Sequence, residues 1–210
     1  MRNNMWDIEN AAYSEGFEAV AGVDEAGRGP LAGDVYAAAV ILPRGAVIDG
    51  LDDSKKLTAR TRERLFDVIT ARAEAFGIAS ASVEEIEARN ILGATYLAMN
   101  RALERLLFAT RLTNALADGR FIALIDGNRN AGIEYANRTV VKGDSLSANI
   151  AAASILAKVS RDRYMETLAR SYPGYGFERN RGYGTAEHRA AIKSLGATAE
   201  HRKLFLRKLY

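Results

Sequence analysis

The sequence of 210 residues contains no cysteine, only two histidines and only three prolines. The absence of cysteine excludes disulfide scaffolds, thiolate nucleophiles, iron–sulfur clusters and cysteine-based zinc sites. Long hydrophobic runs are also missing: the longest stretch without a charged side chain, residues 145–157, has 13 residues, and a bilayer span needs roughly 20. The first ten residues lack the apolar core of a signal peptide. We therefore expect a cytoplasmic protein without membrane association.

Charge is nearly balanced over the whole chain and uneven along it. Lys and Arg number 29 against 26 Asp and Glu, and 48% of the residues are hydrophobic, which is typical of a folded globular domain. Residues 177–210 hold eight Lys or Arg and three acids. This basic segment favours binding to a polyanion, and an ordinary solvated helical face is the alternative.

Hydrophobic patterning predicts alternating strands and helices, hence an α/β domain. We expect strands at residues 19–23, 35–42, 77–83, 121–125 and 139–141. Helices are expected after Thr58, over residues 91–116 and over residues 147–171. Beyond Pro173 the chain becomes rich in glycine and aromatic residues. Two short helices are expected there, over residues 186–195 and from residue 199 onward, with Thr185 and Thr198 as N-caps.

Four carboxylates follow predicted strands: Asp24 and Glu25 after the first, Asp126 after the fourth and Asp144 just beyond the fifth. Strand ends form the binding crevice of open α/β sheets, so three chain segments can deliver these acids to one place. Taken alone, each of these acids could equally be an ordinary turn or helix-capping residue. Adjacent strand residues point to opposite faces, so Asp24 and Glu25 share a site only if the strand ends or bulges there.

Clustered carboxylates raise each other's pKa, and a divalent cation relieves that repulsion. Because the predicted ligands are all oxygen atoms, the cluster favours Mg²⁺ or Mn²⁺ over Zn²⁺ or Cu²⁺. Paired ions of this kind promote in-line displacement at phosphorus, which indicates phosphodiester chemistry. The sequence has no phosphate-binding loop of the G-x-x-x-x-G-K-[ST] type, and both histidines lie in the basic segment, which disfavours a Ser-His-Asp triad.

Seven motifs, in order, give the chain a resemblance to the bacterial ribonuclease HII family, the type 2 ribonucleases H. They are VDEAGRGPL at residues 23–31, DSKKL at 53–57, NIL at 90–92 with Met99, IDGN at 125–128, VKGD at 141–144, AAASILAKV at 151–159 with Arg161 and Asp162, and GYGT at 182–185 with His188. The resemblance implies a ribonuclease H-like fold: a mixed five-stranded sheet with an antiparallel second strand, flanked by helices. It also implies a catalytic domain over residues 1–173 and a small helical, substrate-binding C-terminal region over residues 174–210.

By this resemblance, Asp24, Glu25, Asp126 and Asp144 are catalytic and hold two Mg²⁺ or Mn²⁺ ions. The expected substrates are RNA·DNA hybrids, cut in the RNA strand, and duplex DNA with a single ribonucleotide, cut on its 5′ side. Both reactions leave 5′-phosphate and 3′-hydroxyl ends, and the family is expected to be monomeric.

Further residues are expected to bind the substrate. Gly27 and Gly29 let backbone groups approach the ribose, whose 2′-hydroxyl can donate and accept hydrogen bonds. Arg28 can reach a phosphate, and Tyr183 offers an aromatic surface, although a turn with a packed aromatic ring is its alternative. The remaining candidates for phosphate contact or support of the site are Lys55, Lys56, Asn90 and Ser154. For the two lysines a solvated loop is the alternative.

Two other functions stay open at this point. One is a non-catalytic nucleic-acid or metal-binding protein that keeps the same fold, although four clustered negative charges would harm phosphate binding on their own. The other is a different two-metal nuclease or polynucleotidyl transferase of this fold, against which the Gly-Arg-Gly and Gly-Tyr-Gly-Thr elements argue. The sequence identifies no protein partner.

Overall fold

The computed structural model describes residues 4–109 and 113–207 and is built around a five-stranded sheet of order β3-β2-β1-β4-β5. The strands are β1 (Ala19–Ala26), β2 (Val35–Ile41), β3 (Ala75–Ala81), β4 (Phe121–Asp126) and β5 (Asn137–Val140). β2 runs antiparallel to β1 and β3, while β1, β4 and β5 are parallel. The predicted mixed sheet with an antiparallel second strand is confirmed.

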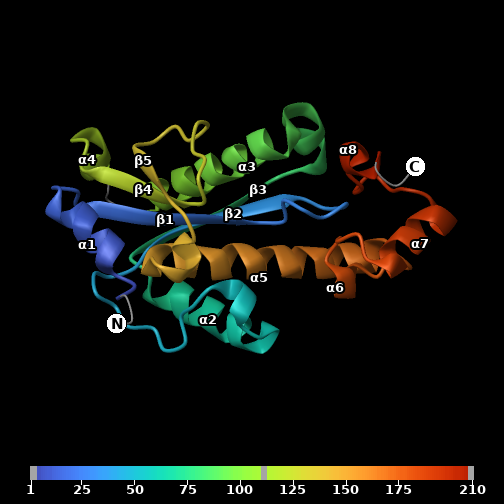
Figure 1. Cartoon of the computed structure of the whole chain (residues 1–210), viewed down its shortest axis with the longest axis horizontal. Coiled ribbons are helices and arrows are strands. Elements are labelled where there is room, and N and C mark those ends of the chain that lie inside the picture. Colours follow the sequence, from blue (N-terminus) through green and yellow to red (C-terminus); the bar gives the residue numbers. More distant parts are fainter. Residues whose placement is uncertain (1–3, 110–112, 208–210) are drawn as a thin grey trace.

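Helices cover both faces of this sheet (Figure 1). They are α1 (Asp7–Ser14), α2 (Ala59–Arg72), α3 (Val83–Phe108), α4 (Thr113–Ala117), α5 (Ala148–Ser171), α6 (Phe177–Asn180), α7 (Ala186–Leu195) and α8 (Lys203–Leu206), with short 3₁₀ turns η1 (Ser54–Lys56) and η2 (Gly143–Ser145). α3 packs on one face and α5 on the other, with α2 outside α5. No helix in the described part of the chain is long and apolar enough to span a membrane.

Side-chain caps explain where several helices begin. Thr58 and Thr185 accept hydrogen bonds from the backbone N–H three residues later, as predicted, and Ser147 does the same for α5. Before α3, Ser82 and Glu85 form a reciprocal capping box, so helical structure begins at Val83. The predicted start at residue 91 is where the chain resumes its helix after the non-helical Asn90, whose side chain accepts the Leu92 and Gly93 amides.

Several predicted elements were wrong in their limits. β1 continues to Ala26, so Asp24 and Glu25 lie within the strand and not after it, β3 covers residues 75–81 instead of 77–83, and β5 covers residues 137–140 instead of 139–141. α3 ends at Phe108 instead of residue 116, and it bends at Asn90, whose backbone has φ 61° and ψ 169°. Phe76, assigned by its spacing to the helix after Thr58, lies in β3. The last helix begins at Lys203 and not at residue 199, because the Thr198 backbone and hydroxyl contact the His201 ring instead of capping a helix.

Alternation along β1 decides which face each site residue occupies. Ala21 and Val23 pack in the core beneath α3, whereas Val20 packs with Ile150 of α5 on the other face. At Gly22 a Cβ would lie 2.2 Å from the backbone of α5, so this helix rests directly on the strand. The alternation therefore directs Asp24 toward α5 and Glu25 toward α3.

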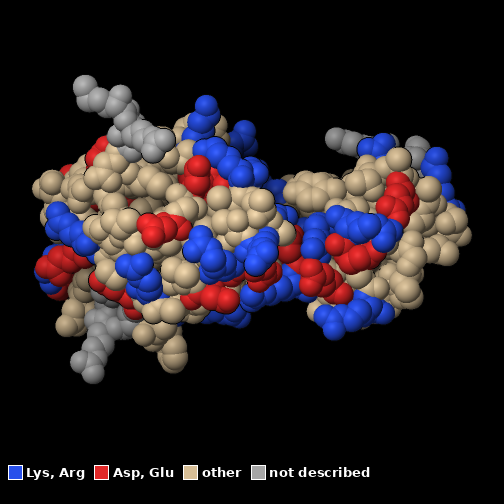
Figure 2. Space-filling model, turned by 90° about the horizontal axis from the view of Figure 1, so that it is seen from below, with Lys and Arg blue, Asp and Glu red and all other residues tan. Residues whose placement is uncertain are grey.

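The last turns of α5 pack against the C-terminal helices in a separate apolar cluster that includes Met165, Phe177 and Ile192. Figure 2 shows the molecule narrowing between the sheet and these helices. Since α5 contributes to both parts, the division at residue 173 stays a prediction. Of the basic residues in this region, Arg179 and Arg181 pair with acids and Arg202 is buried, so less positive charge is exposed than composition indicates.

Candidate active site

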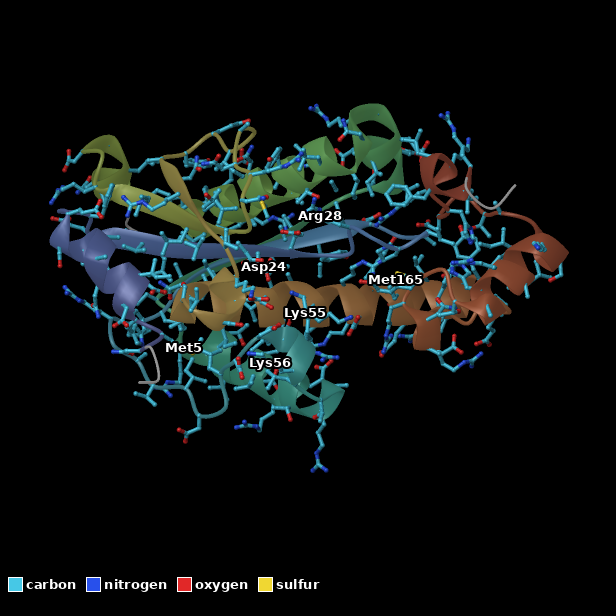
Figure 3. All side chains as sticks on the ribbon, in the orientation of Figure 1. Met5, Asp24, Arg28, Lys55, Lys56 and Met165 are labelled. Atoms are coloured by element: carbon cyan, nitrogen blue, oxygen red, sulfur yellow. The ribbon has the colours of Figure 1, made fainter. Side chains whose placement is uncertain are left out.

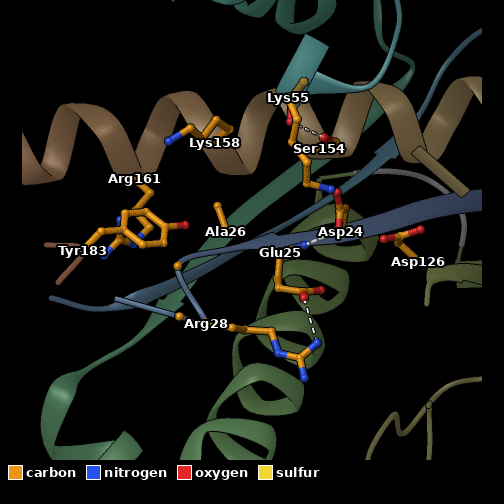
Figure 4. Close-up of a pocket in the computed structure, with 13 residues that line it drawn as sticks. Asp24, Glu25, Ala26, Arg28, Lys55, Asp126, Ser154, Lys158, Arg161 and Tyr183 are labelled. Carbon is orange, nitrogen blue, oxygen red and sulfur yellow. Dashed lines mark hydrogen bonds and ion pairs between the residues drawn. The ribbon is translucent and has the colours of Figure 1, made fainter. Parts of the chain in front are cut away.

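A cavity of about 260 Å³ opens at the carboxyl ends of β1 and β4. Its walls come from β1 and the turn that follows, from η1, from Asp126 and from α5, and Tyr183 closes the side toward the C-terminal helices (Figure 4). Asp24, Glu25 and Asp126 all contribute to this lining. The cavity thus gathers three of the four acids predicted to act together.

The two adjacent acids of β1 point to opposite sides of the strand (Figure 4). The pairing with β2 continues regularly through Asp24, Glu25 and Ala26, so the strand neither ends nor bulges at the acids. Asp126 lies at the end of β4, and its Oδ1 accepts the Gly143 N–H at 2.7 Å. Glu25 therefore extends to the α3 side of the strand while still bordering the cavity.

Burial and mutual repulsion make the cluster electrostatically costly. Asp24 is only 5% exposed, and burial followed by the charges of Glu25 and Asp126 raises its pKa well above the ordinary value. Burial also raises the pKa of Glu25, and burial together with the charge of Asp144 raises the pKa of Asp126. The cluster holds more negative charge than its own surroundings neutralise.

Two cations meet this charge, one on each side of β1 (Figure 3). On the α5 side, Lys55 Nζ donates to Asp144 Oδ2 at 2.9 Å, and this hydrogen bond raises the pKa of the amine. On the α3 side, Arg28 Nη1 donates to Glu25 Oε1 at 3.1 Å. Asp144 itself is 5% exposed, and it meets the cavity through Lys55.

The donor set fits a hard divalent cation in its chemistry, since it is all carboxylate oxygen and carries unneutralised charge. The positions do not surround an ion: within residues 4–109 and 113–207, no three His, Asp or Glu side chains converge closely enough to hold one. Glu25 lies across the strand from Asp24, and Asp144 is paired with Lys55. These side chains must rearrange to coordinate a metal.

The glycines of the turn after β1 have different surroundings. Gly27 has φ +101°, and a Cβ there would lie 2.0 Å from Arg161 Nε. Its carbonyl accepts a hydrogen bond from buried Arg202 at 2.7 Å, so this oxygen faces the protein and not the cavity. Both glycines line the cavity, and a Cβ on Gly29 would meet only the Tyr183 ring, at 3.6 Å, so Gly29 is the one with open space beside it.

The other predicted binding residues divide into two groups. Lys55 and Ser154 line the cavity, and Ser154 Oγ donates to Ser54 Oγ at 2.6 Å. Lys56 is turned toward Asp52 and Ser145 and is not part of the lining. Asn90 is also outside it: this exposed residue forms the bend of α3, where its side chain accepts the Leu92 and Gly93 amides.

Sequence reasoning missed Lys158 and Arg161 as cavity residues. Both stand within quoted motifs, and with Ser154 they are spaced four and three residues apart, which places them on one face of α5. That spacing was the available signal. A second cavity, of about 350 Å³, lies on the α3 side of the acids and is bordered by Glu25, Arg28 and Asp126.

Comparison with known proteins decides the family. The model of the family described as Ribonuclease HII matches residues 21–209 of the chain. The chain belongs to the ribonuclease HII family. It is similar to the ribonuclease HII of Ruegeria pomeroyi, with 53% identity over 201 residues that cover 95% of this chain and 81% of the relative. The Geobacter sulfurreducens ribonuclease HII is 48% identical over 96% of this chain and 88% of that protein. By this membership the chain is a type 2 ribonuclease H.

Solved structures support the ribonuclease H-like fold of this family member. The ribonuclease H2 of Pyrococcus horikoshii has a TM-score of 0.67 and 24% identity, over 90% of this chain and 96% of that chain. A crystal structure of Bst ribonuclease HIII in complex with Mn²⁺ has a TM-score of 0.66 and 21% identity, over 89% of this chain and 65% of that one. At these identities the likeness concerns the fold alone.

Proposed function

We propose that this ribonuclease HII family member is an endonuclease that hydrolyses the RNA strand of RNA·DNA hybrids and cuts 5′ of single ribonucleotides in duplex DNA. The observation that carries the proposal is one cavity in which Asp24, Glu25 and Asp126 stand beside Gly29 and Tyr183. Carboxylates suited to metal ions and a surface suited to a sugar are thus adjacent. A cytoplasmic, monomeric protein stays our expectation.

Asp24, Glu25, Asp126 and Asp144 are the residues that would hold Mg²⁺ or Mn²⁺, whose chemistry is to activate water and to stabilise charge at phosphorus. For these acids to become ligands, Lys55 must release Asp144 and Arg28 must release Glu25. The Arg28 side chain is about half exposed and the Lys55 side chain is mostly exposed, so each can turn to a substrate phosphate once released.

Selection of the substrate needs a group that reads the 2′-hydroxyl. Gly29 and Tyr183 stand face to face at the cavity, and the Tyr183 side chain is about half exposed. A sugar bound between them would contact the ring on one side and the backbone of the turn on the other. Because Tyr183 is not part of the core, its removal should affect substrate binding more than folding.

A binding protein without catalytic activity is the competing function. Buried acids whose pKa values are raised by burial and mutual charge oppose the approach of a phosphate unless a cation neutralises them. Such an arrangement is costly for simple binding and useful for metal-dependent hydrolysis, so it favours the enzyme.

The proposal is tested with three labelled duplexes, RNA·DNA, RNA·RNA and DNA·DNA, incubated with Mg²⁺ or Mn²⁺. We expect cleavage only of the RNA strand of the hybrid, lost in Asp24→Asn and Asp126→Asn. Tyr183→Ala should keep the melting temperature and raise KM. Glu15→Gln is the matched control, because Glu15 forms an exposed ion pair with Arg138 outside the cavity.

Cleavage of all three duplexes, or full activity in the Asp24→Asn protein, would contradict the assignment. Binding of the hybrid without any cleavage in either metal would favour the non-catalytic alternative. An unchanged KM in Tyr183→Ala would remove this residue from the substrate site.

A further inference from the structure

Two fully buried arginines lie beneath the turn formed by residues 27–34. Arg161, on α5, is 1% exposed, and Arg202, just before α8, is 0% exposed. Within residues 4–109 and 113–207 neither guanidinium forms an ion pair with a carboxylate. Burial, followed by the charge of Arg161, lowers the pKa of Arg202 to about 9. Burying two positive charges under one turn without an acidic partner costs folding free energy.

Backbone carbonyls of the turn solvate these charges. Arg202 donates to the carbonyls of Gly27 (2.7 Å), Arg28 (3.2 Å), Pro30 (3.0 Å) and Gly33 (2.8 Å). Arg161 donates to those of Ala32 (3.1 Å) and Asp34 (3.0 Å). Six carbonyls of an eight-residue segment are therefore fixed by two side chains. A planar guanidinium, with five donors in a rigid fork, is suited to this task.

The same arginines join the turn to the segment that carries Tyr183. Arg161 Nη1 donates to the Arg181 carbonyl at 2.9 Å, and the Leu31 amide donates to the Gly182 carbonyl at 2.8 Å. At Gly182 a Cβ would lie 2.6 Å from the Ala32 carbonyl, so the two backbones are in direct contact. The separation between Gly29 and Tyr183 therefore depends on where the arginines hold both segments.

Fixing the carbonyls also determines which backbone groups are left for a ligand. Arg28 and Gly29 are exposed at the cavity, and in the described part of the chain their amides donate to no protein acceptor. The turn thus offers N–H donors on its outer side while its oxygens face the arginines. A sugar hydroxyl or a phosphate oxygen accepts hydrogen bonds of this kind.

We propose that Arg202, together with Arg161, is a positioning residue for ribonucleotide selection, holding the 27–34 turn against the Tyr183 segment so that a single 2′-hydroxyl can be read. Arg202 does not line the cavity and acts only through the turn. The inference rests on the proposed function and adds residues that determine its specificity. Loss of this positioning should matter most where one ribonucleotide supplies the only 2′-hydroxyl, because a long hybrid offers one at every register.

The test compares Arg202→Lys with wild type on a duplex with one ribonucleotide and on a long hybrid. Lysine keeps the charge but cannot donate hydrogen bonds to four separate carbonyl oxygens. We expect KM for the single-ribonucleotide duplex to rise about tenfold more than KM for the hybrid, as loss of one well-placed hydrogen bond would give. Lys203→Ala, at the neighbouring position, is the control and should leave the ratio unchanged. The slope of affinity against salt should not change, because Arg202 touches no phosphate.

A purely structural role would lower kcat on both substrates in equal proportion through loss of folded protein, and that result would overturn the proposal. An unchanged ratio in a folded Arg202→Lys protein would also overturn it. If that variant does not fold, Arg161→Lys carries the same comparison, because Arg161 holds the other end of the turn. Failure of wild type to cut either substrate would instead contradict the proposed function.

Discussion

Gly27 and Gly29 are two residues apart in sequence, and glycine is required at the two positions for different physical reasons. Gly27 adopts φ +101°, and the space for its side chain is filled by Arg161. Gly29 has room for a methyl group, which would project toward Tyr183. The first glycine is needed for the turn to form, and the second leaves room at the cavity.

Alanine substitutions should separate these two requirements. Gly27→Ala is expected to lower the free energy of unfolding by about 2 kcal/mol or more, through the positive φ and the contact with Arg161. Gly29→Ala should change it by less than about 1 kcal/mol while reducing turnover of the hybrid. Urea denaturation and a cleavage assay measure both effects. Equal destabilisation by the two substitutions would refute the distinction.

The C-terminal region is held together by a buried chain of hydrogen bonds through both histidines. His201 Nδ1 accepts from the Thr198 amide at 2.9 Å, so its proton lies on Nε2 and is donated to His188 Nε2 at 3.1 Å. His188 Nδ1 then donates to the Tyr183 carbonyl at 2.9 Å. This order of donors requires both rings to be neutral.

Acid should therefore weaken this region. Burial, followed by the charge of His188, lowers the pKa of His201 to about 4, and burial lowers the pKa of His188. Below pH 6.5, the ordinary pKa of histidine, the unfolded chain binds protons that the folded chain does not bind. The free energy of unfolding is therefore highest above that pH and decreases as the pH falls toward 4. For His201 the loss amounts to about 3 kcal/mol.

NMR titration measures this directly, because the chain has only two histidines and His188→Asn assigns their signals. We expect neither ring to titrate near pH 6.5 in the folded protein, and His201 to titrate near pH 4. A midpoint near 6.5 for either ring would show that the pair is not buried and neutral.

Sequence patterns predicted those elements whose determinants, such as helix caps and hydrophobic spacing, lie within a few residues of one another. The caps at Thr58 and Thr185 and the long helix α5 follow from spacing and caps, and the antiparallel second strand follows from the resemblance carried by the motifs. The bend at Asn90 was not predicted, although its signal is local: the Asn90 side chain accepts the Leu92 and Gly93 amides, as an N-cap residue does. The carboxylates were found at strand ends, whereas the burial of Arg202 depends on carbonyls about 170 residues away and left no local signal.

Without a bound metal ion, the acidic cluster at the cavity lowers the stability of the whole molecule. Asp24 has its pKa raised by burial and by its acidic neighbours, and Lys55 and Arg28 offset only part of the charge. A group with a raised folded pKa stabilises the fold at low pH and loses that contribution as the pH rises beyond the ordinary value near 3.8. At neutral pH, Asp24 therefore destabilises the metal-free protein.

Asp24→Asn should accordingly make the metal-free protein more stable at pH 7, with the difference vanishing below the ordinary pKa. The amide oxygen can still accept the Glu25 N–H that Asp24 accepts at 2.7 Å. Urea unfolding with a chelator measures the difference, and Glu15→Gln is the control. Excess Mn²⁺ should stabilise wild type by about 2–3 kcal/mol at a hundredfold its Kd, and the variant by less. A less stable Asp24→Asn protein would contradict this reading of the cluster.

The central claim is that the cavity directs hydrolysis to a ribonucleotide. Mapping the cut at single-nucleotide resolution on a DNA duplex with one embedded ribonucleotide, beside an all-DNA duplex of the same sequence, tests it most directly. We predict one metal-dependent cut on the 5′ side of the ribonucleotide, leaving a 3′-hydroxyl and a 5′-phosphate, with the all-DNA duplex intact. Cutting at other positions, or equal cutting of both duplexes, would contradict the account.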